Sequence, residues 1–356
     1  MGLLVRVIIP FHGPMIKDLN RKEIDYQIIR YTRWVNPQTN AIRKIIRFLR
    51  NLYSLIPIIR YLKKNKPDLV YTNTSTIFPG AIGAKLLGIP HIWHFREFGL
   101  EDYGYQYDLG EKFTFKLINR LSNICLVNSE AVLKKYSKFI NSSKLKVLYE
   151  SYELPLEKVS DCNLIKSNFN CSIVGTLHSA KRQIDAIRAV SLARTKINNI
   201  KLNIVGSGDK EYESLLYSEV EKLKLENYVD FYGYRDDAYS YIQRSNLLLM
   251  CSANEAFGLV TLEALKSGVP VIGTNSGGTP ELITNGYNGL LYNPGDFVTL
   301  SEKIIQLALD HKMLLEMGKN AKDFAENNFR TNEYYEKTRD IILETIGKST
   351  KLSNTV

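Results

Sequence analysis

The sequence predicts an α/β protein with two doubly wound parallel sheets, each in a domain of its own. Short apolar runs rich in β-branched residues alternate with helical patterns along most of the chain, which is typical of parallel sheets. The alternation stops in the polar stretch 156–167 and then restarts. The 356 residues suffice for two cores, so we expect domains at 1–155 and 168–331, joined by 156–167 as a linker.

Residues that break regular structure bound the elements of the first domain. A proline inside a helix removes a backbone donor, and a glycine commonly ends a helix. We therefore expect an interruption at Pro57, a helix end at Gly88 and an N-cap at Ser129. Strands are predicted at 3–9, 25–35, 68–72, 90–95, 123–128 and 146–149, and helices at 41–65, 79–87, 111–122 and 129–139.

The second domain repeats this pattern. Its strands are predicted at 170–174, 201–205, 229–232, 247–250 and 269–274, and its helices at 183–195, 211–223 and 236–244. Two further helices, at 301–327 and 332–346, are expected to close the chain, and residues 332–347 are expected to pack back on the first domain. The tail 348–356 is expected to fray.

Composition narrows the classes of function. Hydrophobic residues make up 44% and charged residues 24% of the chain, as in a globular protein, and no run of eighteen apolar residues occurs. The formal net charge of +10 favours an anionic partner, such as a nucleotide, a nucleic acid or a membrane surface. The four cysteines form no CxxC pair and the five histidines show no zinc spacing. These observations predict a protein of the reduced cytoplasm.

The stretch 251–290 carries the chemistry. Glu255 and Glu263 lie on either side of an expected helix start at Phe257, and Thr279 is expected to cap a second helix after the glycine pair 277–278. Each helix N-terminus presents free N–H groups and the positive end of a dipole. Carboxylates beside such anion sites suit a ligand that has both phosphate and hydroxyl groups, as a sugar nucleotide has.

The segment 41–66 is basic and amphipathic. Its basic residues lie among isoleucine, leucine and phenylalanine. Two interpretations stay open, namely a solvated helix with an apolar stripe toward the core, and a helix that contacts a membrane surface.

An ordered set of motifs resembles glycosyltransferase family 4, whose members are retaining enzymes of the GT-B fold. The set comprises EAFGLVTLE at 255–263, GVPVI at 268–272, GGTPE at 277–281, KPDLV at 66–70, GIPHIWHFRE at 88–97, the segment 175–181, VGSG at 205–208 and FYG at 231–233. The resemblance covers nearly the whole chain and is strongest in its C-terminal half. It implies two Rossmann-like domains that face a cleft, with ligands at the carboxyl ends of the strands.

The resemblance implies roles on the donor side. Glu255 would accept hydrogen bonds from hydroxyls of the donor sugar, beside the N–H groups of Phe257, Gly258 and Leu259. Glu263 would hold the ribose hydroxyls, because a carboxylate can accept two at once. The alternatives are an ordinary loop carboxylate for Glu255 and an ordinary acid on a helix surface for Glu263.

Lys181 matches the diphosphate-binding lysine of the family. Its ammonium would offset the charge that develops on the leaving diphosphate. The family often has an arginine directly after the preceding glycine, where this chain has Thr176, and Arg182 is a candidate substitute. A solvated Lys181–Arg182 pair is the alternative.

Three further residues complete the implied site. His94, at the end of an expected strand, matches the family's active-site histidine, which touches the donor sugar; a purely structural histidine is the alternative. Gly233 and Arg235 would border the nucleotide base. Arg96 and Glu97 are weaker candidates that could simply pair with each other.

The N-terminus departs from the family pattern. Members usually begin with a strand, a glycine-rich loop and a helix, whereas 3–9 here resembles the second strand. We expect that one βα unit, roughly 35 to 40 residues, is missing relative to the family. A sheet with 3–9 in its central first-strand position would contradict this expectation.

The resemblance implies retaining transfer from a nucleotide-diphosphate sugar to a hydroxyl acceptor, such as a lipid-linked glycan in surface polysaccharide assembly. No metal is expected, because Lys181 and helix N-termini would hold the diphosphate. We expect a cytoplasmic protein, peripheral on the membrane through 41–66. The alternatives are a non-catalytic sugar-nucleotide-binding subunit, motivated by Thr176 and the missing unit, and a nucleic-acid binder. The mainly aliphatic 41–66 offers no aromatic stacking surface, and no nucleic-acid partner is expected.

Overall fold

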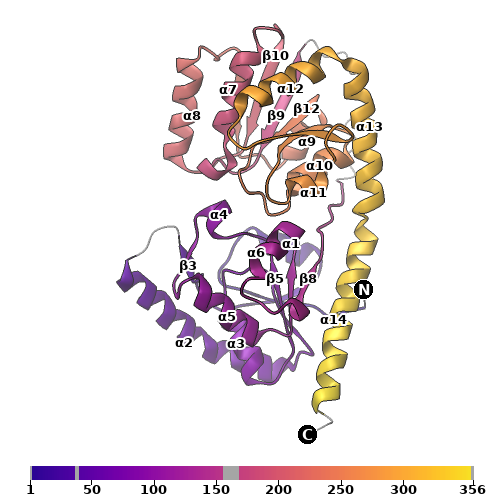
Figure 1. The fold of residues 1–356 in the computed structure, drawn as a ribbon. Coiled ribbons are helices and arrows are strands. Elements are labelled where there is room, and N and C mark those ends of the chain that lie inside the picture. Colours follow the sequence, from indigo (N-terminus) through magenta and orange to yellow (C-terminus); the bar gives the residue numbers. More distant parts are fainter. Residues whose placement is uncertain (1, 37–39, 155–167, 354–356) are drawn as a thin grey trace. The chain divides into compact units, whose positions relative to one another are not determined.

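The computed structural model describes residues 2–36, 40–154 and 168–353 (Figure 1). The chain divides into two compact units. The N-terminal unit comprises Met1–Leu148 and Tyr335–Val356, and the C-terminal unit comprises Tyr149–Tyr334. The predicted linker 156–167 lies outside the described residues, and the residues from Tyr335 onward group with the N-terminal unit.

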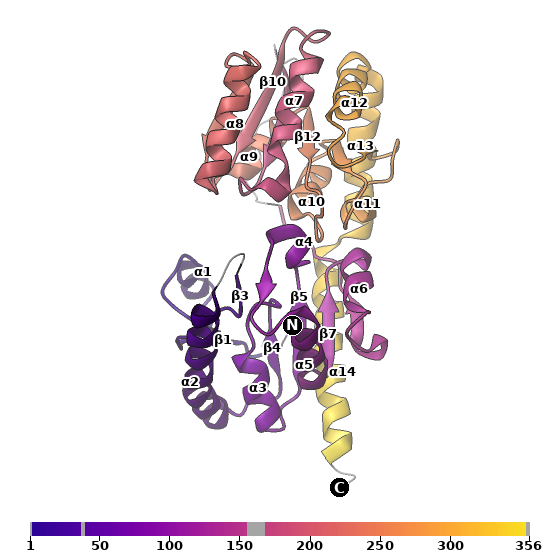
Figure 2. The ribbon, with the colours of Figure 1, turned by 60° about the vertical axis from the view of Figure 1, so that its left-hand side comes forward.

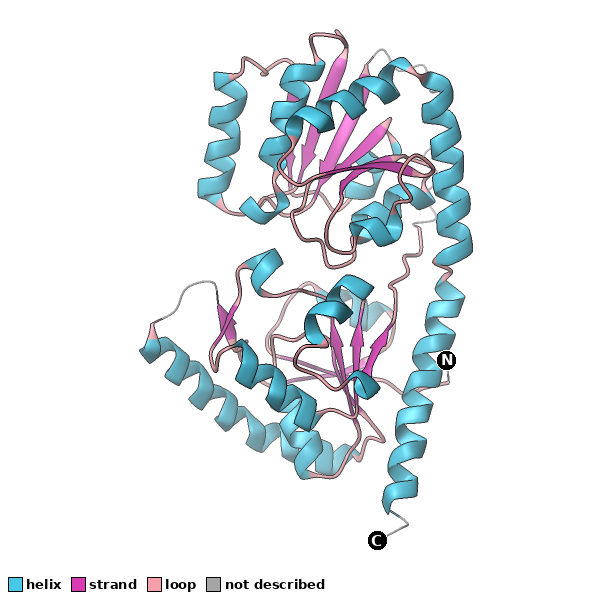
Figure 3. Ribbon diagram, viewed as in Figure 1, coloured by secondary structure: helices cyan, strands magenta, loops and turns pink. Residues whose placement is uncertain are grey.

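The C-terminal unit contains a six-stranded parallel sheet between helices (Figure 3). Its strand order is β11-β10-β9-β12-β13-β14. The strands are β9 (Phe169–Val174), β10 (Ile200–Val205), β11 (Val229–Gly233), β12 (Leu247–Met250), β13 (Val271–Thr274) and β14 (Gly289–Tyr292). The helices are α7 (Gln183–Ala193), α8 (Lys210–Lys222), α9 (Ala238–Gln243), α10 (Leu259–Lys266), α11 (Thr279–Leu282), α12 (Phe297–Leu309) and α13 (His311–Asn328).

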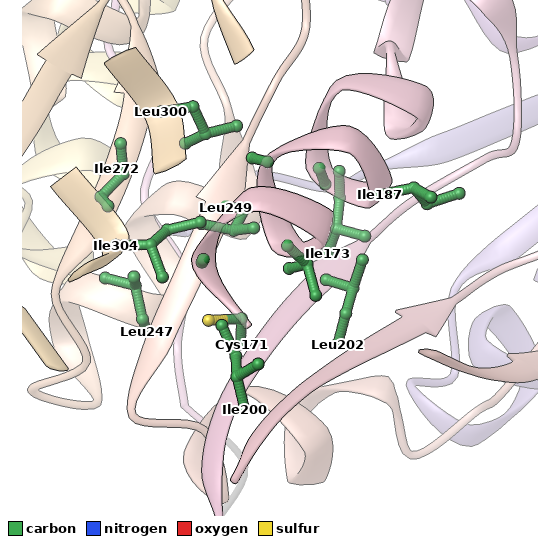
Figure 4. Close-up of a cluster of buried hydrophobic side chains, with 14 of the residues drawn as sticks. Cys171, Ile173, Ile187, Ile200, Leu202, Leu247, Leu249, Ile272, Leu300 and Ile304 are labelled. Carbon is green, nitrogen blue, oxygen red and sulfur yellow. The ribbon is translucent and has the colours of Figure 1, made fainter. Parts of the chain in front are cut away.

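Alternating side chains of each strand build two cores in this unit. Leu247 and Leu249 of β12 join one core with residues of α7, α8 and α12, whereas Leu248 and Met250 join the other with residues of α9, α10 and α11. Figure 4 shows the first core, where Ile173 of β9 lies among labelled side chains of the neighbouring strands and helices. Because successive side chains of a strand point to opposite faces, one sheet supports both layers of helices.

The N-terminal unit contains a parallel four-stranded sheet in the order β4-β5-β7-β8 and two smaller pairs, β1-β2 and β3-β6. The strands are β1 (Arg6–Ile9), β2 (Asp25–Ile28), β3 (Val35–Asn36), β4 (Val70–Thr72), β5 (His91–Phe95), β6 (Gln106–Tyr107), β7 (Ile124–Val127) and β8 (Leu145–Val147). The helices are α1 (Met15–Arg21), α2 (Ala41–Asn65), α3 (Pro79–Leu86), α4 (Leu100–Tyr103), α5 (Glu111–Leu121), α6 (Glu130–Tyr136) and, from Tyr335 onward, α14 (Thr331–Ser353).

The first strand does not occupy a central position in the four-stranded sheet. Among the described residues, β1 pairs only with β2, and β4 is the edge strand beside β5. The arrangement that would contradict a missing βα unit is therefore not found, and the missing unit stays a prediction.

Several predicted boundaries are wrong. The strand expected at 25–35 ends at Ile28, and Thr32 turns its N–H to the side chain of Asn51 on α2. Helix α2 continues through Pro57, because Ile58 and Leu62 anchor the helix in the core beyond the lost hydrogen bond.

Two further differences concern helices. The helix expected at 301–327 is two helices, because the Asp310 side chain accepts from the N–H of Met313 and starts α13. Helix α1 was not predicted, and α14 extends to Ser353.

Phe115 tests the core of the N-terminal unit. Its ring is fully buried and packs on Phe95, Tyr107 and Tyr136, so Phe115→Ala should cost roughly 3–5 kcal/mol of unfolding free energy. Phe113, on the same helix, is 58% exposed. We expect Phe113→Ala to change the unfolding free energy by less than about 0.5 kcal/mol. Denaturant unfolding followed by tryptophan fluorescence measures both, since both tryptophans of the chain lie in this unit. Equal losses in the two variants would contradict this view of the core.

Candidate active site

The winding of the six-stranded sheet changes direction between β9 and β12. From β9 the chain adds β10 and β11 on one side, and it then returns to add β12, β13 and β14 on the other. In sheets of this kind, ligands bind at the carboxyl ends of the strands at such a switch point. The segments that leave β9 and β12 there are 175–182 and 251–258.

These two segments bring Lys181 and Glu255 together. The Lys181 Nζ lies 2.6 Å from the Glu255 Oε2. The Ala253 N–H donates to the Ala180 carbonyl at 3.1 Å, so the two loops are also joined through their backbones. Both side chains keep contact with solvent, with 22% of Lys181 and 14% of Glu255 exposed. An ammonium and a carboxylate, chosen separately from the sequence, thus form one ion pair at the switch point.

A glycine pair fixes the backbone around Glu255. Gly277 has φ +58°, and a Cβ there would lie 2.4 Å from the Glu255 carbonyl oxygen. A Cβ on Gly278 would lie 2.5 Å from the Ala256 carbonyl oxygen. The Gly278 N–H donates to the Glu255 carbonyl at 2.7 Å. Only glycine permits this approach, so the turn after β13 holds the loop that carries Glu255.

A second pair of glycines supports the loop that carries Lys181. A Cβ on Gly206 would lie 1.9 Å from the Gly175 carbonyl oxygen, and one on Gly208 would lie 2.1 Å from the Leu177 carbonyl oxygen. The sequence offered 205–208 only as one of the motifs that resemble the family, and it gave no sign of the packing partner. Sequence analysis named both glycine pairs within motifs, but it missed that they pack against the backbone of the two loops.

Helix α10 begins at Leu259, four residues after Glu255 and two after the predicted start at Phe257. Its N-cap is Gly258, with φ +99°, so no side chain caps the first-turn N–H groups. Phe257 is buried and anchors the turn in the core, while Leu259 is 37% exposed. The free N–H groups place the positive end of a helix dipole beside the Glu255 loop. The second expected helix, α11, is a single turn of four residues.

Glu263 lies on α10 and is partly buried. Burial raises the pKa of its carboxyl to about 7. A carboxyl in such surroundings is held near the balance of its two protonation states at neutral pH, and ligand hydroxyls that donate to the charged form would favour that form.

Arg182 and Thr176 are two further residues that the sequence predicts to bind the donor. Arg182 donates from two nitrogens to the buried Asp185, at 2.6 and 3.1 Å, so in this structure its guanidinium faces its own helix α7. Thr176 is exposed, and its carbonyl accepts from the side chain of Gln183 at 3.0 Å. Their predicted roles as donor ligands stay predictions.

Gly233 and Arg235 lie at and just beyond the end of β11. Gly233 has φ +63°, and its carbonyl accepts from the Gly206 N–H at 2.8 Å. Arg235 is exposed, pairs with Asp237 at 2.9 Å and lies over the ring of Tyr241. The expectation that they border the base stays a prediction.

His94 belongs to the N-terminal unit, where it is fully buried on β5. The Tyr71 hydroxyl lies 2.7 Å from its Nδ1. Burial, and to a lesser degree the charge of Arg96, lowers the pKa of His94 to about 3, so the imidazole is neutral. A contact between His94 and a donor sugar stays a prediction.

Glu97 is not simply paired with Arg96. Its buried carboxylate accepts from the backbone N–H groups of Ser75 and Arg96 at 2.6 and 3.0 Å, and from the hydroxyls of Thr74 and Ser75, each at 2.7 Å. This hydrogen bonding joins the ends of β4 and β5, which gives Glu97 a structural task that its sequence context did not reveal.

Glu263→Gln tests the pKa of this carboxyl. Between the ordinary glutamate pKa and about 7, the folded protein holds a proton that the unfolded chain has lost, so stability falls as pH rises through this window. In this pH window, we expect Glu263 to lower the unfolding free energy by up to about 1.4 kcal/mol for each pH unit of increase. The variant should lack this contribution. Denaturant unfolding between roughly pH 5 and pH 8 measures the difference. The exposed Glu302 supplies the control Glu302→Gln, and identical pH profiles for wild type and Glu263→Gln would contradict the prediction.

Comparison with known proteins connects this site to a family. Residues 165–324 match the family "Glycosyl transferases group 1". The N-acetyl-alpha-D-glucosaminyl L-malate synthase of Bacillus anthracis is 34% identical over 175 residues, which are 47% of this chain and 45% of that protein. The chain thus spans about half the length of that relative. The capsular polysaccharide biosynthesis glycosyltransferase CapM of Staphylococcus aureus is 26% identical over 355 residues, 92% of each chain.

Solved structures share the fold. HepE of Anabaena, in complex with UDP, superposes with a TM-score of 0.79 at 21% sequence identity, covering 95% of this chain and 92% of that one. The sucrose-phosphate synthase of Thermosynechococcus elongatus superposes with a TM-score of 0.73 at 15% identity, covering 96% and 99%. Residues 165–324 therefore belong to the glycosyl transferases group 1 family, and the chain, with its two parallel α/β sheets, has the GT-B fold.

Proposed function

We propose that this protein transfers a sugar from a nucleotide-diphosphate sugar to a hydroxyl group of a glycan or lipid-linked glycan, with retention of the anomeric configuration. The observation that carries the proposal is the pair of Lys181 and Glu255 at the switch point of the C-terminal sheet, 2.6 Å apart. A cation for a diphosphate and a carboxylate for sugar hydroxyls lie there on neighbouring loops.

Each residue has a part in donor binding under this proposal. The Lys181 ammonium leaves Glu255 to contact the diphosphate, and Glu255 then accepts hydrogen bonds from the sugar. The N–H groups of 257–259, at the N-terminal end of α10, face the negative charge, and no side chain caps the first turn of this helix. Glu263 accepts from the ribose hydroxyls, and the segment 233–235 borders the base.

The transfer step needs no side-chain nucleophile. The acceptor oxygen bonds to the anomeric carbon on the face that the diphosphate leaves. The bond between that carbon and the phosphate oxygen breaks, and its electron pair stays on the diphosphate, which also takes the acceptor proton. Lys181 stabilises the charge that develops on the leaving group, so the proposal assigns no step to a metal ion.

The relatives suggest the substrates. An Escherichia coli relative, 25% identical over 85% of this chain, is a UDP-Gal:alpha-D-GlcNAc-diphosphoundecaprenol alpha-1,3-galactosyltransferase, and HepE has been solved with UDP-glucose. These names favour a UDP-hexose donor and a lipid-linked acceptor. No described helix of this protein is long and apolar enough to cross a membrane. Because the acceptor proposed from these relatives is lipid-linked, we propose peripheral association with the cytoplasmic face of the membrane that holds it.

Glu255→Gln tests the catalytic assignment. The change keeps the size of the side chain but removes the charge and one acceptor, and we expect kcat/KM to fall about 10²- to 10³-fold. Turnover of a panel of UDP-sugars with lipid-linked acceptors, followed by release of UDP, measures this. Glu219→Gln is the matched control, because Glu219 is also largely buried and pairs with Arg188 at 2.6 Å, away from the site.

Three results would contradict the proposal or a part of it. Equal turnover in the two variants would remove Glu255 from the site. Binding of UDP-sugars by the wild-type protein without turnover on any acceptor would favour the alternative, a non-catalytic sugar-nucleotide-binding subunit. Inversion of the product anomer, determined by NMR, would exclude the retaining course.

A further inference from the structure

Over residues 41–56 of helix α2 (Ala41–Asn65), the polar side faces the protein and the apolar side faces outward. The side chains that face the protein there are polar. Asn51 and Ser54 are fully buried, Asn51 accepts from the N–H of Thr32 at 2.8 Å, and Arg47 forms a buried ion pair with Asp108. The helix meets its own unit through apolar residues only further along, at Ile58 and Leu62.

The opposite side of residues 41–56 is apolar and exposed. Ile45, Leu49, Leu52 and Ile56 follow one another at intervals of three or four residues and therefore share one side of the helix. The exposed large apolar residues of α2 are Ile42 (67%), Ile45 (58%), Ile46 (43%), Phe48 (40%), Leu49 (58%), Leu52 (40%), Tyr53 (77%) and Ile56 (49%). In Figures 1 and 2, α2 runs along the outside of the N-terminal unit, beside α3. Single exposed apolar residues are ordinary, but a contiguous group of this size marks an interaction surface.

The charges around this surface identify its partner. The segment 41–66 contains no acidic residue. Arg43 and Arg50, seven residues apart, lie on one flank of the apolar side, and the last turns expose Arg60, Lys63 and Lys64. A second copy of the chain would bring the same cations against each other across a two-fold interface. An anionic lipid surface instead offers headgroups to the cations and acyl chains to the apolar side.

We infer that α2 lies in the interface of an anionic lipid bilayer, with Ile42, Ile45, Leu49, Leu52 and Ile56 below the headgroups and the flanking cations among the phosphates. This inference rests on the proposed function in one respect, because the lipid-held acceptor comes from that proposal. The docking surface itself follows from α2 alone. Apolar insertion and charge both contribute, so binding should require anionic lipid and should weaken when either part is removed.

Leu49→Asn tests the apolar part. Sedimentation of the full-length protein with vesicles of phosphatidylcholine containing phosphatidylglycerol measures the partition coefficient, and we expect the variant to bind about tenfold more weakly than wild type. Leu86→Asn is the matched control, because Leu86 is a 66% exposed leucine on another helix of the same unit, and it should bind like wild type. Both positions are exposed, so circular dichroism should show both variants folded.

The double variant Lys63→Gln/Lys64→Gln tests the charge. It should bind anionic vesicles several-fold more weakly, and raised salt should reduce the difference from wild type. Lys112→Gln/Lys116→Gln removes two exposed lysines of α5 instead and should bind like wild type. Pure phosphatidylcholine vesicles should bind neither the wild type nor any variant appreciably.

Several outcomes would overturn the inference. These are no vesicle binding by wild type, equal binding to neutral and anionic vesicles, or equal losses for Leu49→Asn and Leu86→Asn. Concentration-dependent dimerisation that Leu49→Asn abolishes would identify a second copy as the occupant. Turnover with a water-soluble acceptor separates the two proposals. If the protein turns over this acceptor but does not bind vesicles, only the docking is refuted. If it binds vesicles but shows no turnover, only the transfer is refuted.

Discussion

The ion pair between Lys181 and Glu255 is the contact on which the candidate site depends. Neither loop is held in place by the ion pair alone, since a partly exposed pair of this kind contributes little stability. The backbone contacts of the glycines hold the loops, with Gly206 and Gly208 against the Lys181 loop and the pair 277–278 against the Glu255 loop. Because these glycines have no Cβ, the segments that follow four strands can approach one another closely.

The same arrangement explains how a partly exposed pair can serve a ligand. Under the proposed function, a diphosphate would take the ammonium of Lys181 and leave the Glu255 carboxylate available for hydroxyls of the sugar. Helix α10 adds its uncapped N–H groups to the same place. A cation, a carboxylate and a helix N-terminus on fixed loops are a preorganised set, which is how polar sites favour charge development.

The N-terminal unit is organised differently around its polar groups. Glu97 is buried and takes four hydrogen bonds from the ends of β4 and β5, and His94 is buried and neutral beside Tyr71. Polar groups in this part of the sheet fix its geometry. The outward side of α2, by contrast, presents apolar groups. Exposed apolar groups on α2 are the observation from which its docking to lipid is proposed.

The sequence alone determined the two α/β units and most strands of both sheets, and it named Lys181, Glu255 and Glu263 as candidate site residues, because strand and helix periodicity and ordered motifs are local properties. Tertiary structure decided what those residues meet. It joined Lys181 to Glu255, turned Arg182 onto Asp185, and enclosed His94 in the core. It also decided which side of α2 faces the protein. Periodicity identifies an amphipathic helix, but only the packing of Asn51, Ser54 and Arg47 against the rest of the unit shows that the apolar side is the one left outside.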